Sequence, residues 1–422
     1  MDFLQKLKLV WSDSTLRKRL LFIGAMLIAF RFLSAIPIPG INVAELANFF
    51  ANNQFFGLLN IFSGGGLSNL SIVMLGVGPY ITASIIMQLL TMMSPKLKAM
   101  YHEDGEAGRA KFAQYSRLLS LPLALIQAFG FLVLLSRQGV ISDLALFSTA
   151  TNVIIVTGGS LLMMWIGEIM TEYGIGNGTS LIIFAGIVAS IPGAASQLAF
   201  AFDPSDIPMY FGFLALSILV VFGVVVVTEA ERPIPVTYAK RVRGMKVYGG
   251  VSTYLPLRVN QAGVIPIIFA LSIMLFPQMV ATVLSAFDNA ILHSLSSFLN
   301  IVFANSWVYS ILYFALVFLF TYFYTAVTFD PDTIATNLQK NGAFIPGVRP
   351  GTATAAYIGS VTTRITLVGA VFLALVAVLP LAMQGITGNS SLAIGGTALL
   401  IVVSVVLDFM KKIDAQVSMR EY

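Results

Sequence analysis

Long apolar stretches alternate with short polar connections along the whole chain. Ten of these stretches are long enough to cross the roughly 30 Å hydrocarbon core of a bilayer, which takes about 20 helical residues. They comprise residues 20–36, 72–92, 118–135, 152–169, 179–201, 209–227, 262–284, 307–328, 365–383 and 392–409. The pattern predicts an all-α polytopic membrane protein with ten transmembrane helices.

Basic residues gather in alternate connections. Of the 24 lysines and arginines, 22 lie in the N-terminal segment, in the second, sixth and eighth connections, or in the C-terminal segment. The connections on the opposite side hold only Arg137, and Arg31 lies inside the first apolar stretch. Because cytoplasmic connections are enriched in Lys and Arg, this distribution predicts that both termini are cytoplasmic.

Composition supports a membrane protein and argues against an enzyme. The chain is 57% hydrophobic and 10% charged, with a mean hydropathy of +0.88 and no cysteine. Its two histidines are predicted on opposite sides of the membrane, so we expect no metal site and no cofactor. The sequence contains no phosphate-binding loop motif, paired carboxylates or serine–histidine arrangement, so we expect no catalytic residues.

Few ionisable residues lie inside the apolar stretches. Arg31, Glu168 and Asp408 are each within reach of a helix end, where a long side chain can extend to water. Carriers coupled to protons or sodium normally need buried carboxylates or a broken-helix ion site, and neither is evident here. We therefore expect passive transport, with energy supplied by a partner.

The first outer connection contains a short apolar segment interrupted by glycines, FFGLLNIFSGGGLSNL (Phe55–Leu70). It is too short to span a bilayer. Non-helical backbone at membrane depth persists only where protein buries it or where it lines a water-filled cavity. Two interpretations remain open: a half-helix folded back into a central cavity, or an interfacial loop on the outer surface.

The longest cytoplasmic connection, residues 229–261, predicts a protruding β-ribbon with a basic tip. Apolar and aromatic residues alternate around Val236, Tyr238, Val247 and Tyr248, on either side of Arg243. Basic residues interleaved with tyrosines suit an RNA or an acidic protein surface. The alternative is that these charges only set topology. The segment FIPGVRPG, residues 344–351, predicts a second docking loop on the same side.

Uncharged polar residues inside the stretches have two interpretations as well. They either hydrogen-bond neighbouring helices or form weak contacts along a seam that must open. The residues concerned are Thr82, Ser84, Gln88, Gln127, Asn260 and Gln261.

A set of motifs in this chain resembles the SecY family, the channel subunit of the bacterial protein translocase. The resemblance runs in order over about residues 16–408. Its motifs are IPIPGIN (residues 36–42), NIFSGGGLSNLS (60–71), GPYITASIIMQLL (78–90), GIGNGTSLIIFAGIV (174–188), KVYGGVSTYLPLRVNQAGVIP (246–266) and FIPGVRPG (344–351).

The resemblance implies two five-helix halves related by inverted pseudo-symmetry around an hourglass pore. These are residues 1–201 (spans one to five) and 202–422 (spans six to ten, with cytoplasmic loops 229–261 and 329–364). It implies an apolar pore ring at Val77, Ile81, Ile183, Ile268 and Ile401, where Val77 is smaller than the family's usual isoleucine. It also implies a plug formed by Asn60, Ile61, Phe62, Ser63, Gly64, Gly65, Gly66, Leu67, Ser68, Asn69 and Leu70.

The resemblance further implies a lateral gate that includes Thr82, Gln88, Gln127 and Asn260. It implies a docking surface for partners at Lys240, Arg241, Arg243, Lys246 and Arg349.

The implied function is passive translocation of unfolded secretory polypeptides across the bacterial plasma (inner) membrane and lateral release of transmembrane segments into lipid. The implied partners are small membrane subunits like SecE and SecG, a SecA-type motor ATPase, the ribosome through its RNA, preproteins with signal sequences, and membrane lipids. The alternative is a secondary transporter with broken helices, which would also show glycine-rich broken segments.

Overall fold

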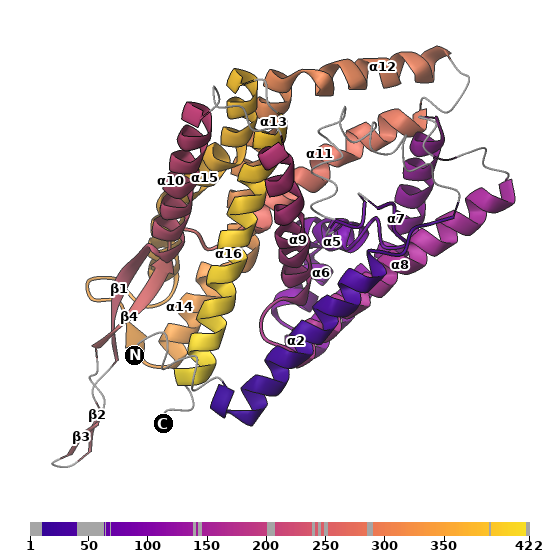
Figure 1. The fold of residues 1–422 in the computed structure, drawn as a ribbon. Helices are drawn as coiled ribbons and strands as arrows, with labels where there is room; N and C mark the ends of the chain where they lie inside the picture. Colours follow the sequence, from indigo (N-terminus) through magenta and orange to yellow (C-terminus); the bar gives the residue numbers. More distant parts are fainter. Residues whose placement is uncertain are drawn as a thin grey trace.

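A computed structural model describes residues 11–39, 63, 65–67, 69–137, 141, 146–200, 207–238, 241–243, 246–248, 252–284, 290–387 and 390–418. Helices dominate this part of the chain, as the apolar pattern predicts (Figure 1). The start of the first described helix, the end of the last one and a small sheet lie at one end of the molecule. Helix α12 (Ala290–Ala304), which runs across the direction of its neighbours, lies at the other end (Figure 1).

The helices of the first half follow the predicted stretches. They are α2 (Ser14–Leu33), α5 (Gly78–Met93), α6 (Pro95–His102), α7 (Gly105–Arg137), α8 (Leu146–Tyr173) and α9 (Gly178–Phe200). Asp13 begins α2, because its carboxylate accepts hydrogen bonds from the backbone N–H groups of Thr15 and Leu16 at 2.7 and 3.3 Å. The second helix begins at Gly78 and not at residue 72. Residues 72–77 form turns instead, with Gly76 at φ 53° and Pro79 in the first turn of α5.

The second half contains the remaining helices. They are α10 (Ile207–Glu229), α11 (Ile265–Leu284), α12 (Ala290–Ala304), α13 (Ser306–Thr328), α14 (Pro331–Lys340), α15 (Thr352–Thr387) and α16 (Ser390–Ser418). Each of the predicted apolar stretches overlaps one helix of the structure. Within the described residues, four helical segments are long and apolar enough to cross a membrane: Gly105–Val133, Phe147–Tyr173, Trp307–Lys340, whose apolar part is α13, and Thr352–Leu379.

The β-ribbon predicted between α10 and α11 is confirmed. Strand β1 (Glu231–Tyr238) pairs antiparallel with β4 (Ser252–Arg258), and β2 (Arg241–Arg243) pairs with β3 (Lys246–Tyr248) beyond them. The sequence did not predict a further strand, β5 (Ala343–Phe344), which pairs with the other edge of β1. The two predicted docking loops, residues 229–261 and 344–351, therefore belong to one structural unit.

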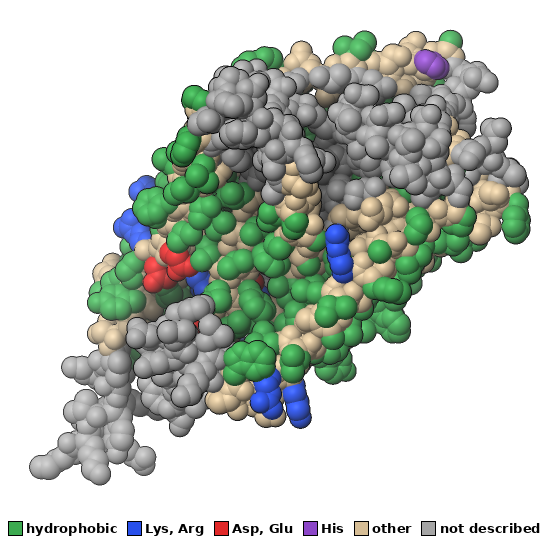
Figure 2. All heavy atoms as spheres, in the orientation of Figure 1, with side chains coloured by type: hydrophobic (Ala, Val, Ile, Leu, Met, Phe, Trp, Pro, Cys, Tyr) green, Lys and Arg blue, Asp and Glu red, His purple; other side chains and the backbone are tan. Residues whose placement is uncertain are grey.

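The two halves of the described chain make their main contacts in two places. Helix α11 contacts α5 and α7, and helix α16 contacts α9. A large apolar cluster extends across both halves and includes residues of α2, α8, α9, α11, α13, α15 and α16. On the face shown in Figure 2, hydrophobic side chains cover much of the helical surface, and the visible Lys, Arg, Asp and Glu side chains lie below the end that carries α12.

Candidate functional site

The predicted ring residues all belong to one large buried apolar cluster. Val77 directly precedes α5, the others lie on α5, α9, α11 and α16, and their exposed fractions range from 0% for Val77 to 8% for Ile81. The members are Val77, Ile81, Ile183, Ile268 and Ile401. Branched aliphatic side chains offer no hydrogen bond to water or to a passing chain. A constriction built from them can exclude water by dewetting.

A polar cavity of about 460 Å³ adjoins three of these residues, Ile81, Ile183 and Ile268. Its polar lining comes from α5, α7, the last turns of α8, the start of α9 and α13. The polar side chains that line it are Tyr80, Ser84, Gln88, Arg117, Glu168, Thr171, Glu172, Asn177, Thr179, Ser180 and Tyr324. The cavity therefore has polar and ionisable side chains in one part of its lining and the apolar side chains of Ile81, Ile183 and Ile268 in another.

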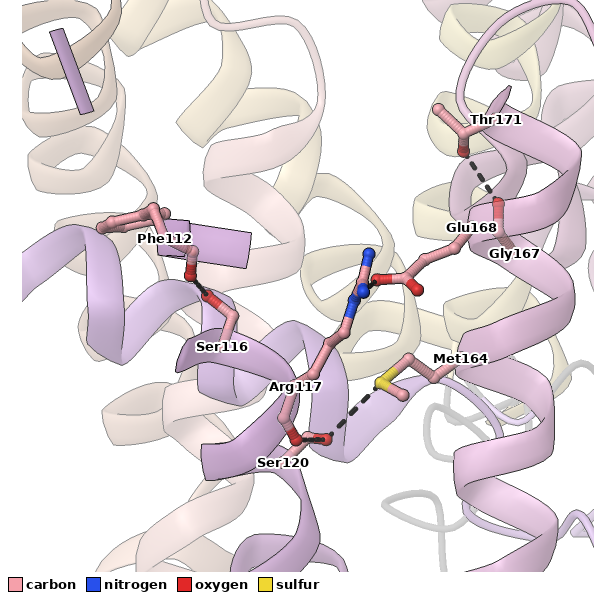
Figure 3. Close-up of polar contacts among 8 residues, drawn as sticks. All are labelled: Phe112, Ser116, Arg117, Ser120, Met164, Gly167, Glu168 and Thr171. Atoms are coloured by element: carbon pink, nitrogen blue, oxygen red, sulfur yellow. Dashed lines mark hydrogen bonds and ion pairs between the residues drawn. The ribbon is translucent and has the colours of Figure 1, made fainter. Parts of the chain in front are cut away.

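An ion pair joins two helices in the wall of this cavity. Arg117 Nε on α7 donates to Glu168 Oε1 on α8 at 2.6 Å, and Figure 3 shows the two side chains reaching toward each other. The Glu168 side chain is 18% exposed and that of Arg117 is 49% exposed. The expectation that Glu168 simply extends to water is thus corrected, because its carboxylate has a fixed cationic partner. The sequence did carry a signal for this ion pair: Arg117 lies at the edge of one apolar stretch, and Glu168 is the lone carboxylate inside the next stretch.

Hydroxyl groups reinforce the same region. Ser120 Oγ on α7 donates to the carbonyl of Arg117 at 2.7 Å and lies 3.5 Å from Met164 Sδ on α8 (Figure 3). Thr171 Oγ1 donates to the carbonyl of Gly167 and accepts from the N–H of Gly178, each at 2.8 Å. The second bond ties the start of α9, and hence Ile183, to the end of α8.

The predicted plug is described only in part. Residues Asn60, Ile61, Phe62, Gly64 and Ser68 lie outside the described residues. The remaining plug residues, Ser63, Gly65, Gly66, Leu67, Asn69 and Leu70, form turns. For these residues the expectation of a half-helix is wrong, because Gly65 has φ 83° and Leu70 has φ 41°, both incompatible with a right-handed helix.

The described plug residues are buried and not spread on an outer surface. Leu67 and Leu70 are at most 1% exposed and pack with Leu132 and Leu135 of α7 and Val156 of α8. Backbone hydrogen bonds then tie the chain to the end of α2: Ile38 N–H donates to the carbonyl of Leu70, and Ile72 N–H donates to that of Ile36, each at 2.9 Å. For this part of the connection, the interfacial-loop interpretation is wrong.

The predicted gate residues lie on or next to helices that contact one another. Thr82 and Gln88 are on α5, Gln127 is on α7, and Asn260 precedes α11. Thr82 Oγ1 donates to the carbonyl of Gly78 within its own helix at 3.0 Å. Asn260 Nδ2 donates to the carbonyl of Gly263 at 3.2 Å. Within the described part of the chain, Gln88 Oε1 and Asn260 Oδ1 are buried and have no hydrogen-bond partner.

The predicted docking residues lie around the sheet. Arg241 and Arg243 are on β2, Lys246 is on β3, and Lys240 is outside the described residues. Arg349 is exposed in the turn between β5 and α15, where its carbonyl accepts from Thr354 Oγ1 at 2.8 Å. Because β5 pairs with β1, both basic loops extend from the same sheet (Figure 1).

This arrangement of helices is that of a polytopic membrane channel. It is similar to a solved structure described as a protein-conducting channel, with a TM-score of 0.66, 20% identity, and coverage of 94% of this chain and 91% of that one. It is also similar to canine Sec61 in a ribosome–channel complex, with a TM-score of 0.62, 19% identity, and coverage of 94% and 91%.

The sequence comparisons identify the family. The SecY family pattern matches residues 71–410. A curated relative from Streptomyces coelicolor, protein translocase subunit SecY, is 42% identical over 425 residues, which cover 96% of each chain. The chain belongs to the SecY family, so it is a translocation channel subunit of the membrane and not an enzyme. Family membership sets aside the secondary-transporter alternative.

Proposed function

We propose that the cluster of Val77, Ile81, Ile183, Ile268 and Ile401 is the seal of a passive channel for unfolded polypeptides. The observation that supports this is the position of Ile81, Ile183 and Ile268 at the boundary between the buried apolar cluster and the polar cavity. An apolar constriction excludes water when idle and presents no fixed hydrogen bond to any particular sequence. A channel built this way accepts many substrates.

The described turns around Leu67 and Leu70 form part of the plug in this proposal. Their burial against α7 and α8 supports this role, because a plug has to pack inside the protein and not on its surface. Opening displaces these turns, which are held by the backbone hydrogen bonds to the end of α2.

The lateral gate lies where α5 and α7 meet α11, with Thr82, Gln88, Gln127 and Asn260 along it. Residues 1–201 and 202–422 form the two halves that separate there, while the α9–α16 contact holds them together on another side. Weak polar contacts suit a gate of this kind, because hydrogen bonds between membrane helices average about 0.6 kcal/mol. An apolar signal helix can outcompete them by partitioning into lipid.

The sheet is the docking surface for the energy source. Arg241, Arg243, Lys246 and Arg349 carry positive charge toward a SecA-type motor or ribosomal RNA, and Lys240 adds to it. Small membrane subunits like SecE and SecG complete the unit. The chain resides in the bacterial plasma membrane with both termini and the sheet in the cytoplasm, as the charge distribution predicts.

Ion conductance tests the seal. Ile183→Gly should raise resting conductance in a planar bilayer, because it removes apolar surface at the cavity boundary. Ile187→Gly is the matched control: it lies on the same helix, is equally buried in the same cluster and does not line the cavity. Equal resting conductance for Ile183→Gly and the unmodified protein would show that Ile183 is an ordinary packing residue. Equal leakage from both variants would show general disruption of α9.

A further inference from the structure

Helix α12 joins α11 to α13 at the end of the molecule opposite the sheet. Figure 1 shows it running across the direction of α13 and not alongside it. One face of α12 is held against the protein: Ser296 is 2% exposed, and its Oγ donates to the carbonyl of Ala281 on α11 at 2.7 Å. Phe303 packs against the main apolar cluster. These contacts fix the rotation of α12 about its axis.

A second face of α12 is exposed and mostly apolar, with Ser294 as a polar residue between the apolar side chains. Ile291, Leu295, Phe298 and Ile301 are 77%, 47%, 61% and 72% exposed. Their spacings of three and four residues place them in one stripe along the helix. A stripe of four large apolar side chains held toward water would be unfavourable, because burial of apolar surface away from water stabilises a protein.

The third face of α12 is polar. His293 and Ser297 are exposed and lie four residues apart on the flank that borders the apolar stripe at Ile301. A helix with one protein-facing side, one apolar side and one polar side is typical of a segment that lies in the plane of a membrane interface. The upper edge of the molecule in Figure 2, where α12 lies, shows hydrophobic side chains and a histidine at the surface.

The apolar stripe continues onto a helix that crosses the membrane. Residue Asn305 separates α12 from α13, and α13 exposes Trp307 (78%) and Ile311 (67%) in its first turns. Tryptophan favours the boundary between headgroups and acyl chains. The surface next to α12 is therefore already the lipid-facing surface of this membrane protein.

We propose that α12 is a monotopic interfacial helix whose stripe of Ile291, Leu295, Phe298 and Ile301 inserts into the acyl boundary of the leaflet on its side of the membrane. His293 and Ser297 face the headgroups and water. Because Ser296 ties α12 to α11 and Asn305 ties it to α13, the lipid contact holds the ends of both helices at a fixed depth.

Single-cysteine mapping tests this proposal, because the chain contains no natural cysteine. Leu295→Cys, Phe298→Cys and the matched control Ser297→Cys are each labelled with the fluorophore NBD in the full-length protein. The protein is placed in phosphatidylcholine nanodiscs, where both leaflets are accessible. Labels at 295 and 298 should be quenched by brominated acyl chains and protected several-fold from aqueous iodide. The label at 297 should show the reverse.

Two outcomes would overturn the proposal. Iodide quenching at 295 and 298 equal to that at 297 would mean that the stripe faces water. Protection from both iodide and brominated lipid would mean that protein, such as a second copy of this chain, covers the stripe. As an independent check, Leu295→Glu combined with Phe298→Glu should expose a label at Ile301→Cys to iodide, while Ser297→Glu should not. No change at residue 301 in the double variant would also contradict the proposal.

Discussion

At the scale of single residues, the ion pair between Arg117 and Glu168 fixes the relation of α7 and α8 on one wall of the polar cavity. The pair lies between a half-exposed guanidinium and a mostly buried carboxylate. Solvent therefore weakens the attraction between the two charges but does not abolish it. Its main role is geometric, because it keeps α7 aligned next to the apolar boundary.

A double-mutant cycle measures this coupling. Arg117→Gln and Glu168→Gln should each lower the thermal unfolding midpoint in detergent. The free energy of unfolding of the double variant should fall by less than the sum of the two single decreases. The difference is the coupling free energy, which should be about 1 kcal/mol or less. Glu172→Gln, on the same cavity, is the control that should couple weakly to Arg117. Strict additivity of Arg117→Gln and Glu168→Gln would show that the pair contributes nothing measurable.

At residue scale, α8 and the turn at Ile72 approach each other so closely that residue 159 has no room for a side chain. A Cβ added to Gly159 on α8 would lie 2.0 Å from the carbonyl oxygen of Ile72, whereas a Cβ on Gly158 would meet nothing within 4 Å. Gly159→Ala should therefore push away the turns at residues 72–77, at a cost of roughly 1–3 kcal/mol. Gly158→Ala should be neutral or stabilising by up to about 1 kcal/mol, because alanine favours a helix.

Thermal unfolding and resting conductance together check this pair of variants. Gly159→Ala should unfold at a lower temperature and leak more ions, because the displaced turns connect the proposed plug to α5. If Gly158→Ala and Gly159→Ala unfold at the same temperature, the contact between α8 and the turns is looser than the geometry indicates.

At the scale of elements, Asp330 begins α14 in the connection that carries Arg349. Its carboxylate accepts from Asp332 N–H at 3.1 Å and from Thr333 Oγ1 at 2.7 Å. Partial burial raises the pKa of this carboxyl, but the hydrogen bonds from Thr333 and Asp332 and the nearby charge of Lys98 outweigh burial and leave the pKa below its ordinary value. The folded state therefore favours the ionised form.

The sign of the pH dependence follows from this direction. Because the folded pKa is lower than the unfolded value of about 3.9, the stabilisation is full at neutral pH and is lost as pH falls below about 4. Asp330→Ala should weaken the first turn of α14 by about 1 kcal/mol at pH 7. Hydrogen exchange at the amides of Asp332 and Thr333 should accelerate accordingly. Unchanged exchange would show that packing, and not the cap, holds α14.

The shared sheet makes the two basic loops one element for docking. Arg349→Glu should reduce motor-driven or ribosome-driven translocation in reconstituted vesicles, most strongly at low salt, where screening is weakest. Lys340→Glu, an equal change of charge at the end of α14 in the same connection, should have a smaller effect. Equal translocation by Arg349→Glu and the unmodified protein at low salt would mean that Arg349 serves topology only.

At the scale of the whole molecule, the sheet and α12 mark opposite ends. Tyr254→Cys on β4 and Ser297→Cys on α12 both replace exposed residues in a chain without cysteine. A membrane-impermeant maleimide added to intact cells should label residue 297, and it should label residue 254 only in inverted vesicles. The physical reason for this orientation is that Lys and Arg residues, which are enriched on the sheet side of the molecule, are retained in the cytoplasm. Reversed labelling would overturn both the orientation and the assignment of the sheet as a docking surface.

The sequence by itself determined the helical class, the positions of the apolar helices and the existence of the basic β-ribbon. These features are local: a helix long enough for the bilayer needs about 20 consecutive apolar residues, and a strand needs alternation with period two. The resemblance to SecY predicted the family, which the comparisons confirm. The assignments of individual ring, plug, gate and docking residues remain predictions.

The tertiary structure alone decided where distant residues meet. It paired Arg117 with Glu168, brought Ile72 against Gly159, added β5 to the edge of β1 and ended the turns before α5 at Gly78. None of these contacts has a periodic signal, because each depends on how a whole helix is rotated and placed by packing against its neighbours. Hydropathy specifies that a helix lies in the membrane, while the interlocking of side chains specifies which face it turns toward the cavity.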